Sequence, residues 1–335
     1  MLLPVREKTL SVRVLECLLV LFALHESGVL HLGYQLYQTR GSLNLHFSSG
    51  VSVWVYYYLR NLSALSILGY VLFRNSNWCR ALATRSTEKM DPPPGRHESR
   101  ASMRELGAVG IVELCLVLFV AFASSVVRSL EVFAGHTTLF SEPKAVGLAN
   151  SVYSMLSPAA AIGLLSYVLD RRCLGFQDLG LRWTSRDVAT ALPLALGSMV
   201  GYWIVGLLAA GGVEMAGGRQ PQVADIGSYL LGTSVSMAAV FGAVLNGFFE
   251  ELIVRGYLMT EVRRLTGSIL FAMLCSMGVQ CSYHLYQGGL PAMAHVGGFL
   301  VFAGYYAKTN RLLPPVLAHS ALDLYAVVMH ALRPT

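Results

Sequence analysis

The chain has 335 residues, of which 54% are hydrophobic and only 13% are charged, and its mean hydropathy is +0.54. A water-soluble domain averages about a quarter charged residues because its surface must be solvated. This composition therefore excludes a soluble globular protein. The net charge of +6 does not indicate a nucleic-acid partner, because the basic residues lie between apolar runs and are typical of contacts with anionic lipid headgroups.

Up to nine apolar segments follow one another along the chain, and each is about long enough to cross the lipid bilayer as a helix. They lie at about 14–36, 50–73, 106–127, 145–169, 188–212, 226–249, 268–286, 291–307 and 313–331. Glycines or charges interrupt several of them. The prediction is therefore an all-α fold, a polytopic transmembrane helical bundle of eight or nine helices. The first segment lacks the small-residue cleavage pattern of a signal peptide, so we expect a retained helix.

The basic residues of the connections predict the orientation. They gather in the loops at 74–105 and 170–187, after the sixth segment, and after the eighth. With a cytoplasmic N-terminus all of these loops are cytoplasmic, as the positive-inside rule requires. We therefore expect a multi-pass protein of the cell membrane.

A polar, proline-broken stretch divides the chain. The run Asp91-Pro92-Pro93-Pro94-Gly95 lies within it and is typical of a flexible linker. We predict an N-terminal two-helix membrane region at 1–85, a polar cytoplasmic linker at 86–105, and a helical bundle at 106–335.

Ionisable side chains at membrane depth are costly, so each needs a partner or a function. Arg60 lies near the middle of the second segment, where Glu16 or Glu113 could supply the opposite charge. The richest cluster is Glu250-Glu251-Leu252-Ile253-Val254-Arg255.

Neighbouring residues on a helix point about 100° apart, so the two carboxylates of this cluster face different ways. Glu251 and Arg255 are spaced i,i+4 and can neutralise each other. Glu250 is left without a local basic partner, which makes it a candidate general base. A headgroup position for both glutamates is the alternative.

A turn at Thr266-Gly267-Ser268 predicts a helical hairpin. Glu250 lies 17 residues before Gly267, and His284 lies 17 residues after it. The two residues are therefore expected at the same depth on adjacent antiparallel helices, roughly 25 Å from the turn. By itself, His284 could equally be a helix-end histidine in an interfacial aromatic belt.

The last segment carries His319 and Asp323, which share one helix face at i,i+4. The pair could be a polar contact in which the Asp fixes the His tautomer, or it could present a donor to an oxyanion.

His295 has no matched partner in the sequence, and we interpret it as a packing or loop histidine. No zinc-binding His-Glu-x-x-His, Gly-x-Ser-x-Gly elbow or Walker loop occurs.

The ordered set of a Glu-Glu-x-x-x-Arg box at 250–255, a His on the next helix and a terminal His-x-x-x-Asp resembles the CPBP family. That family contains type II CAAX prenyl endopeptidases and bacteriocin-processing relatives, which are intramembrane glutamic proteases. The resemblance covers roughly residues 179–328. It implies that Glu251 and Arg255 support the structure of the site.

The resemblance further implies that Glu250 and His284 activate a water for attack on a peptide carbonyl, and that His319 and Asp323 stabilise the oxyanion. The implied activity is intramembrane hydrolysis of a peptide bond in a membrane-associated protein or peptide, such as a CAAX-type tail or a secreted peptide. The implied partners are this substrate and the lipid bilayer.

Two residues depart from the family pattern. Gln280 stands where the second box has Phe, and Asp323 stands where many active members have Asn. An ionised Asp cannot donate a hydrogen bond to an oxyanion. These departures favour the alternative of a non-catalytic membrane scaffold or regulator that retains the protease fold. A transporter is disfavoured because the sequence shows no repeat.

The resemblance implies no metal or other cofactor. Two histidines and a carboxylate also suit zinc, so zinc bound by Glu250, His284 and His319 is the less favoured alternative.

Overall fold

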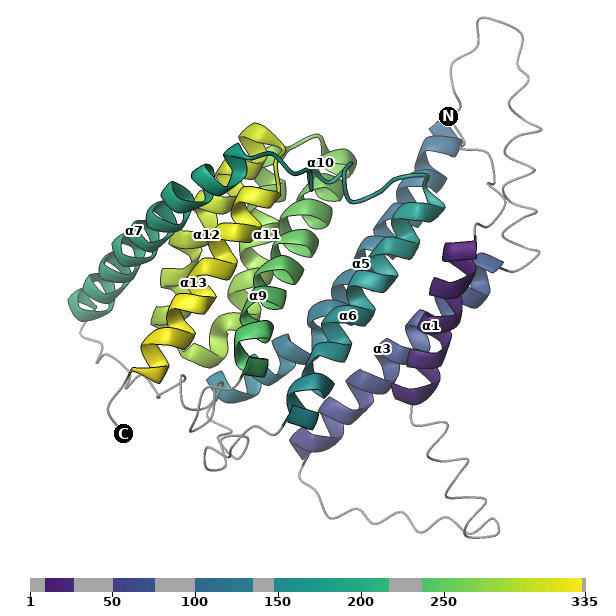
Figure 1. Cartoon of the computed structure of the whole chain (residues 1–335), viewed down its shortest axis with the longest axis horizontal. Coiled ribbons are helices and arrows are strands. Elements are labelled where there is room, and N and C mark those ends of the chain that lie inside the picture. The colour runs from purple at the N-terminus through teal and green to yellow at the C-terminus, as the bar shows by residue number, and fades with distance from the viewer. Residues whose placement is uncertain (1–9, 27–50, 76–99, 135–147, 217–236, 333–335) are drawn as a thin grey trace, which may run out of the picture. The chain divides into compact units, whose positions relative to one another are not determined.

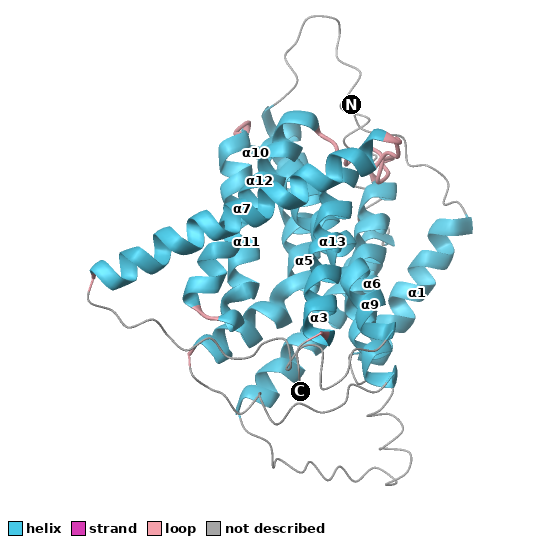
Figure 2. Ribbon diagram, turned by 60° about the vertical axis from the view of Figure 1, so that its left-hand side comes forward, coloured by secondary structure: helices cyan, strands magenta, loops and turns pink. Residues whose placement is uncertain are grey.

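The computed structural model describes residues 10–26, 51–75, 100–134, 148–216 and 237–332. This part of the chain contains helices and no strand (Figure 2). The predicted all-α bundle is confirmed in the described residues, which form nine helices. In this count α9, η2 and α10 are one continuous helix, and the short 3₁₀-helix η3 is left out. The helices are α1 (Leu10–Glu26), α3 (Val51–Asn75), α5 (Arg100–Phe133), α6 (Leu148–Arg171), α7 (Arg186–Met215), α9 (Met237–Glu250), the π-helix η2 (Glu251–Met259), α10 (Thr260–Thr266), α11 (Ile269–His284), the 3₁₀-helix η3 (Leu285–Gln287), α12 (Gly289–Thr309) and α13 (Leu313–Ala331).

Among the described residues, four helices are long and apolar enough to cross a membrane. They are Val109–Phe133, Arg186–Met215, Ile269–Gln287 and Gly289–Thr309. The protein is therefore a multi-pass membrane protein, while the cytoplasmic position of its N-terminus and its place in the cell membrane stay predictions.

The chain forms two compact units, which are residues 1–124 with 160–174 and residues 125–159 with 175–335. The predicted boundaries at 85 and 105 stay predictions. Helix α5 begins at Arg100, so residues 100–105 of the predicted linker are helical, whereas 86–99 lie outside the described residues.

In the first unit, α1 packs on α3, and a buried carboxylate lies in the apolar interior. Glu113 of α5 accepts hydrogen bonds from Arg172, at 2.7 Å from its Nε, and from the Tyr70 hydroxyl. The guanidinium of Arg74 lies 3.5 Å from Glu113 Oε1, the carboxylate oxygen that accepts the hydrogen bond from Tyr70. The Arg60 side chain is outside the described residues.

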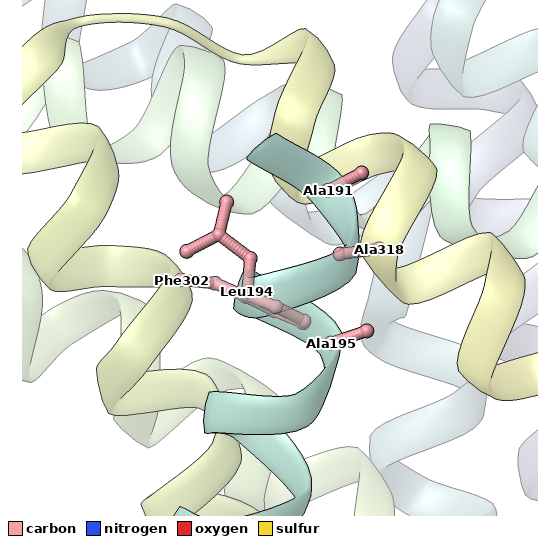
Figure 3. Close-up of a cluster of buried hydrophobic side chains, with 5 residues drawn as sticks. All are labelled: Ala191, Leu194, Ala195, Phe302 and Ala318. Atoms are coloured by element: carbon pink, nitrogen blue, oxygen red, sulfur yellow. The ribbon is translucent and has the colours of Figure 1, made fainter. Parts of the chain in front are cut away.

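In the second unit, α7 packs against α12 and α13, α13 packs against α9, and α11 packs against α12 (Figure 1). Small residues allow this closeness, since a Cβ on Gly297 of α12 would collide with the Gly201 carbonyl of α7. Figure 3 shows the apolar cluster at this junction, with Ala191, Leu194 and Ala195 of α7 against Phe302 and Ala318. The cluster positions the turn of α13 that carries Ala318 and the residue after it, His319.

The predicted turn between α10 and α11 is present. Gly267 ends α10 with φ at +72°, a left-handed conformation that favours glycine. The side chain of Ser268 then caps α11 by accepting a hydrogen bond from the Phe271 amide at 3.2 Å. The chain therefore reverses here, and the ends of α9 and α11 lie side by side.

Candidate active site

The site lies where α9 changes into the π-helix. Glu250 is the last residue of α9, and all residues from Glu251 to Met259 are buried. A π-helix widens the turn by forming i→i+5 hydrogen bonds, and such segments are frequent at functional sites. The two acidic side chains of the box therefore lie at the transition between two helical geometries.

The two carboxylates point to different helices, as their angular separation predicts. Glu250 faces α11, where its Oε2 accepts a hydrogen bond from the Tyr283 hydroxyl at 2.6 Å and lies 3.4 Å from the donating Nε2 of Gln280. Glu251 faces α13 and the next turn of its own helix. The residue that departs from the family pattern, Gln280, is thus in contact with Glu250.

The structure brings Glu250 and His284 together from the two arms of the hairpin. Glu250 Oε2 and His284 Nε2 are 4.0 Å apart. His284 Nε2 is buried and forms no hydrogen bond with any described residue. One water molecule hydrogen-bonded to both atoms, at the usual length of about 2.8 Å, is compatible with this separation. Within the described residues, no arginine or lysine forms an ion pair with Glu250.

Glu251 holds the rest of the site together. Its Oε1 accepts a hydrogen bond from His319 Nδ1 at 2.8 Å and lies 3.4 Å from the Arg255 guanidinium, which is itself completely buried. Arg255 also lies 5.2 Å from the centre of the Phe299 ring. Because a carboxylate only accepts hydrogen bonds, His319 carries a proton on Nδ1.

Asp323 stands beside the other nitrogen of this imidazole. Its Oδ1 is 3.8 Å from His319 Nε2, and its Oδ2 accepts a hydrogen bond from Asn246 Nδ2 at 2.9 Å. The partner that fixes the His319 tautomer is therefore Glu251, and not Asp323 as one sequence interpretation had it. Asn246 was not among the residues predicted from the sequence, although it precedes Glu250 by four residues and so shares a helix face with it.

A cavity of about 170 Å³ opens beside this imidazole, between α7, α12 and α13. Met199, Tyr202 and Phe299 supply apolar walls, while His319 and Asp323 supply the polar wall. The cavity thus joins an apolar space to the polar side chains of His319 and Asp323.

His295 lies beside the candidate site and packs there, as interpreted from the sequence, but it has partners that the sequence did not indicate. Its ring stacks on His284 with 4.5 Å between centroids, and it lines the same cavity. Its Nε2 is hydrogen-bonded to Gln287 Oε1 at 2.6 Å. A lone histidine on α12 carried no spacing signal, because its partners come from other elements.

The described residues contain no group of three His, Cys, Asp or Glu side chains that could hold a metal ion. In the zinc alternative, Glu250 and His284 are adjacent, and the bond of His319 Nδ1 to Glu251 leaves its Nε2 as the ring nitrogen that could bind a metal. The metal-free site and the zinc site both stay predictions.

Comparison with known proteins gives one family match. Residues 232–325 match the family described as type II CAAX prenyl endopeptidase Rce1-like. The matched segment includes the 250–255 box, His284, His319 and Asp323, and it confirms the resemblance stated from the motifs. No curated protein and no solved structure matches the chain.

Proposed function

We propose that the protein is a glutamic endopeptidase that acts within the membrane, because residues 232–325 match the family described as type II CAAX prenyl endopeptidase Rce1-like. It would hydrolyse a peptide bond in a membrane-associated protein or peptide. The observation that carries the proposal is the pair of buried side chains, Glu250 and His284, that face each other across 4.0 Å.

In the proposed reaction, Glu250 is the general base. A water oxygen bonds to the peptide carbonyl carbon while one water proton passes to the Glu250 carboxylate. The carbonyl electron pair moves to oxygen, which becomes the oxyanion. When the carbon–nitrogen bond breaks, the proton held by Glu250 passes to the leaving amine. His284 orients the water through Nε2.

The oxyanion would lie near His319. Its Nε2 faces the cavity side of the site, whereas its Nδ1 is committed to Glu251 at 2.8 Å. To donate from Nε2 as well, the ring must be an imidazolium. Such a cation would be ion-paired with Glu251 and would lie 3.8 Å from Asp323, so its charge would be compensated on both sides.

The apolar cavity supports a peptide substrate with an aliphatic or aromatic side chain near the cleaved bond. A CAAX-type tail or a small secreted peptide fits this description. Hydrophobic walls such as Met199 and Phe299 would bind the side chain, while the polar wall would hold the carbonyl.

The second candidate function is a scaffold that retains the protease fold without catalysis. Two observations favour it, namely that Gln280 occupies one oxygen of the proposed base, and that Asp323 presents only acceptors when ionised. A scaffold would not depend on the carboxylate of Glu250.

The deciding experiment is cleavage of a membrane-associated peptide library by the full-length protein purified in detergent. We expect cleavage by the wild type and loss of cleavage in Glu250→Gln and in His284→Ala. Glu214→Gln is the matched control, because Glu214 is exposed at the end of α7. A folded wild type that cleaves nothing, with Glu250→Gln fully functional in cells, would instead establish the scaffold.

The same assay tests the absence of a metal. We expect cleavage to survive exhaustive chelation. Loss of cleavage with a chelator, and its recovery after zinc is added back, would overturn the metal-free mechanism while keeping the endopeptidase.

A further inference from the structure

A side-chain amide next to the site bonds two imidazoles at once. Gln287 ends the short 3₁₀-helix after α11, and Gly288 then turns the chain with φ at +99°, a conformation that favours glycine. This turn places the Gln287 amide between His284 of α11 and His295 of α12.

Both polar atoms of this amide have hydrogen-bond partners. Nε2 lies 3.2 Å from His284 Nδ1 and 3.0 Å from the Tyr286 hydroxyl, so both amide protons have acceptors. Oε1 lies 2.6 Å from His295 Nε2 and accepts a hydrogen bond from its N–H. An amide that donates to His284 Nδ1 requires a lone pair there, so the proton of the neutral ring is on Nε2.

The other side of the His284 ring favours the same tautomer. Nε2 faces the Glu250 carboxylate at 4.0 Å, and a carboxylate attracts an N–H but repels a nitrogen lone pair. His295 stacks on His284 with an interplanar angle of 24°, which restricts the rotation of the ring away from both partners.

We propose that Gln287 is a positioning residue which, anchored by His295, holds His284 in the tautomer that has its proton on Nε2, the nitrogen facing Glu250. In the endopeptidase mechanism, on which the kinetic consequence rests, this makes His284 a hydrogen-bond donor that orients the water. Glu250 is then the single proton acceptor. Neither Gln287 nor His295 belongs to the motifs that identified the site.

The tautomer itself is tested by nuclear magnetic resonance of the full-length protein in detergent, with isotope-labelled histidine nitrogens. The His284 signals are identified by their loss in His284→Ala. We expect an unprotonated Nδ1 and a protonated Nε2 in the wild type. In Gln287→Glu the new carboxylate only accepts, so the proton should appear on Nδ1.

A wild-type ring protonated on Nδ1 would overturn the proposal, and so would a Gln287→Glu protein whose His284 signals are unchanged. His295→Phe gives a second test, because it keeps the stacked ring and removes the anchor of the amide. We expect His284 to populate both tautomers in this variant. A single unchanged tautomer would show that His295 has no part in positioning.

Kinetics supply the other half of the test. We expect Gln287→Met to lower kcat about tenfold, the usual size of a lost partner that orients a catalytic side chain, with little change in KM. Gln177→Met is the control, because the same substitution there falls on an exposed side chain. An unchanged kcat in Gln287→Met would overturn the catalytic consequence, whereas a wild type without activity would refute the proposed function and leave the tautomer result standing.

Discussion

Two buried carboxylates, one in each compact unit, have opposite surroundings. Glu113 in the first unit is bound by Arg172 and the Tyr70 hydroxyl, and Arg74 lies 3.5 Å away. Cations on two sides compensate its charge. Such an arrangement holds helices together but leaves the carboxylate no capacity to take a proton from a substrate.

Glu250 in the second unit is equally buried, but its hydrogen-bond donors are neutral. They are the Tyr283 hydroxyl at 2.6 Å and the Gln280 amide at 3.4 Å. The nearest imidazole, His284, is 4.0 Å away. Burial alone therefore does not distinguish Glu113 from Glu250, the proposed general base; the charge of their partners does.

The largest expected effect comes from Glu250→Gln. Removal of a general base lowers the rate about 100- to 10,000-fold, while the amide retains the size and the hydrogen-bond acceptor of the carboxylate. We therefore expect kcat to collapse with almost no change in the apparent Tm. If Glu250→Gln lowered the Tm as much as Glu113→Gln does, the claim that only Glu113 has a structural role would be wrong.

Glu113→Gln should show the reverse pattern. The substitution removes the negative charge that faces the Arg172 and Arg74 guanidinium groups. We expect the free energy of unfolding to fall by about 3 kcal/mol, the lower end of the loss when a buried ion pair is broken. The lower end applies because the Arg172 side chain is 17% exposed. Thermal unfolding in one detergent measures the loss, and kcat per folded molecule should be unaffected.

Asp323→Asn tests the polar wall of the site. The change removes an acceptor from beside the developing oxyanion and adds a donor, so kcat should rise about tenfold. Asn246→Asp places a second carboxylate next to Asp323 and should lower kcat by a similar factor. If Asp323→Asn lowers kcat, then the compensation of the His319 imidazolium charge by the Asp323 carboxylate outweighs the gain of a hydrogen-bond donor.

The smallest expected effect concerns the cavity. Met199→Trp narrows its apolar wall, and we expect a loss of about tenfold in kcat/KM, the lower end of the effects of steric changes in a hydrophobic pocket. We expect the loss for peptides with bulky side chains and not for those with small ones. Met215→Trp is the control, because that side chain is 90% exposed on the same helix. Equal losses for all peptides would place the substrate elsewhere.

Much of the fold follows from the sequence, because a membrane helix needs only a sufficiently long apolar run. The proximity of Glu250 and His284 was also predictable, since both lie 17 residues from the turn at Gly267. The i,i+4 pairs needed nothing beyond helix geometry, and Glu251 and Arg255 indeed lie 3.4 Å apart.

The remaining parts of the site depend on contacts between distant segments. Asn246 bonds Asp323, 77 residues away in the chain, and His295 bonds Gln287, eight residues away across the turn into α12, so no helical spacing pairs them. Gln287 and His284 do have the i,i+3 spacing of one helical turn, so the sequence could have indicated that contact. The partners of Glu113 come from α3 and from the end of α6, far from it in the chain. The other contacts form where different helices pack together, and the helical periodicity of the sequence does not indicate them.

The π-helix after Glu250 makes the helix tolerant of a change in its number of residues. Its i→i+5 hydrogen bonds widen the turn, so the segment holds one residue more than an α-helix of the same length. Deleting one residue between 252 and 259 would let the segment relax to α-helical hydrogen bonding without a break. Because the wide turns absorb that residue, the helix on either side of the segment would keep nearly the same facing. A shortened chain could thus still direct Glu250 at α11, and the changes would fall on side chains inside the π-helix, Glu251 and Arg255 among them.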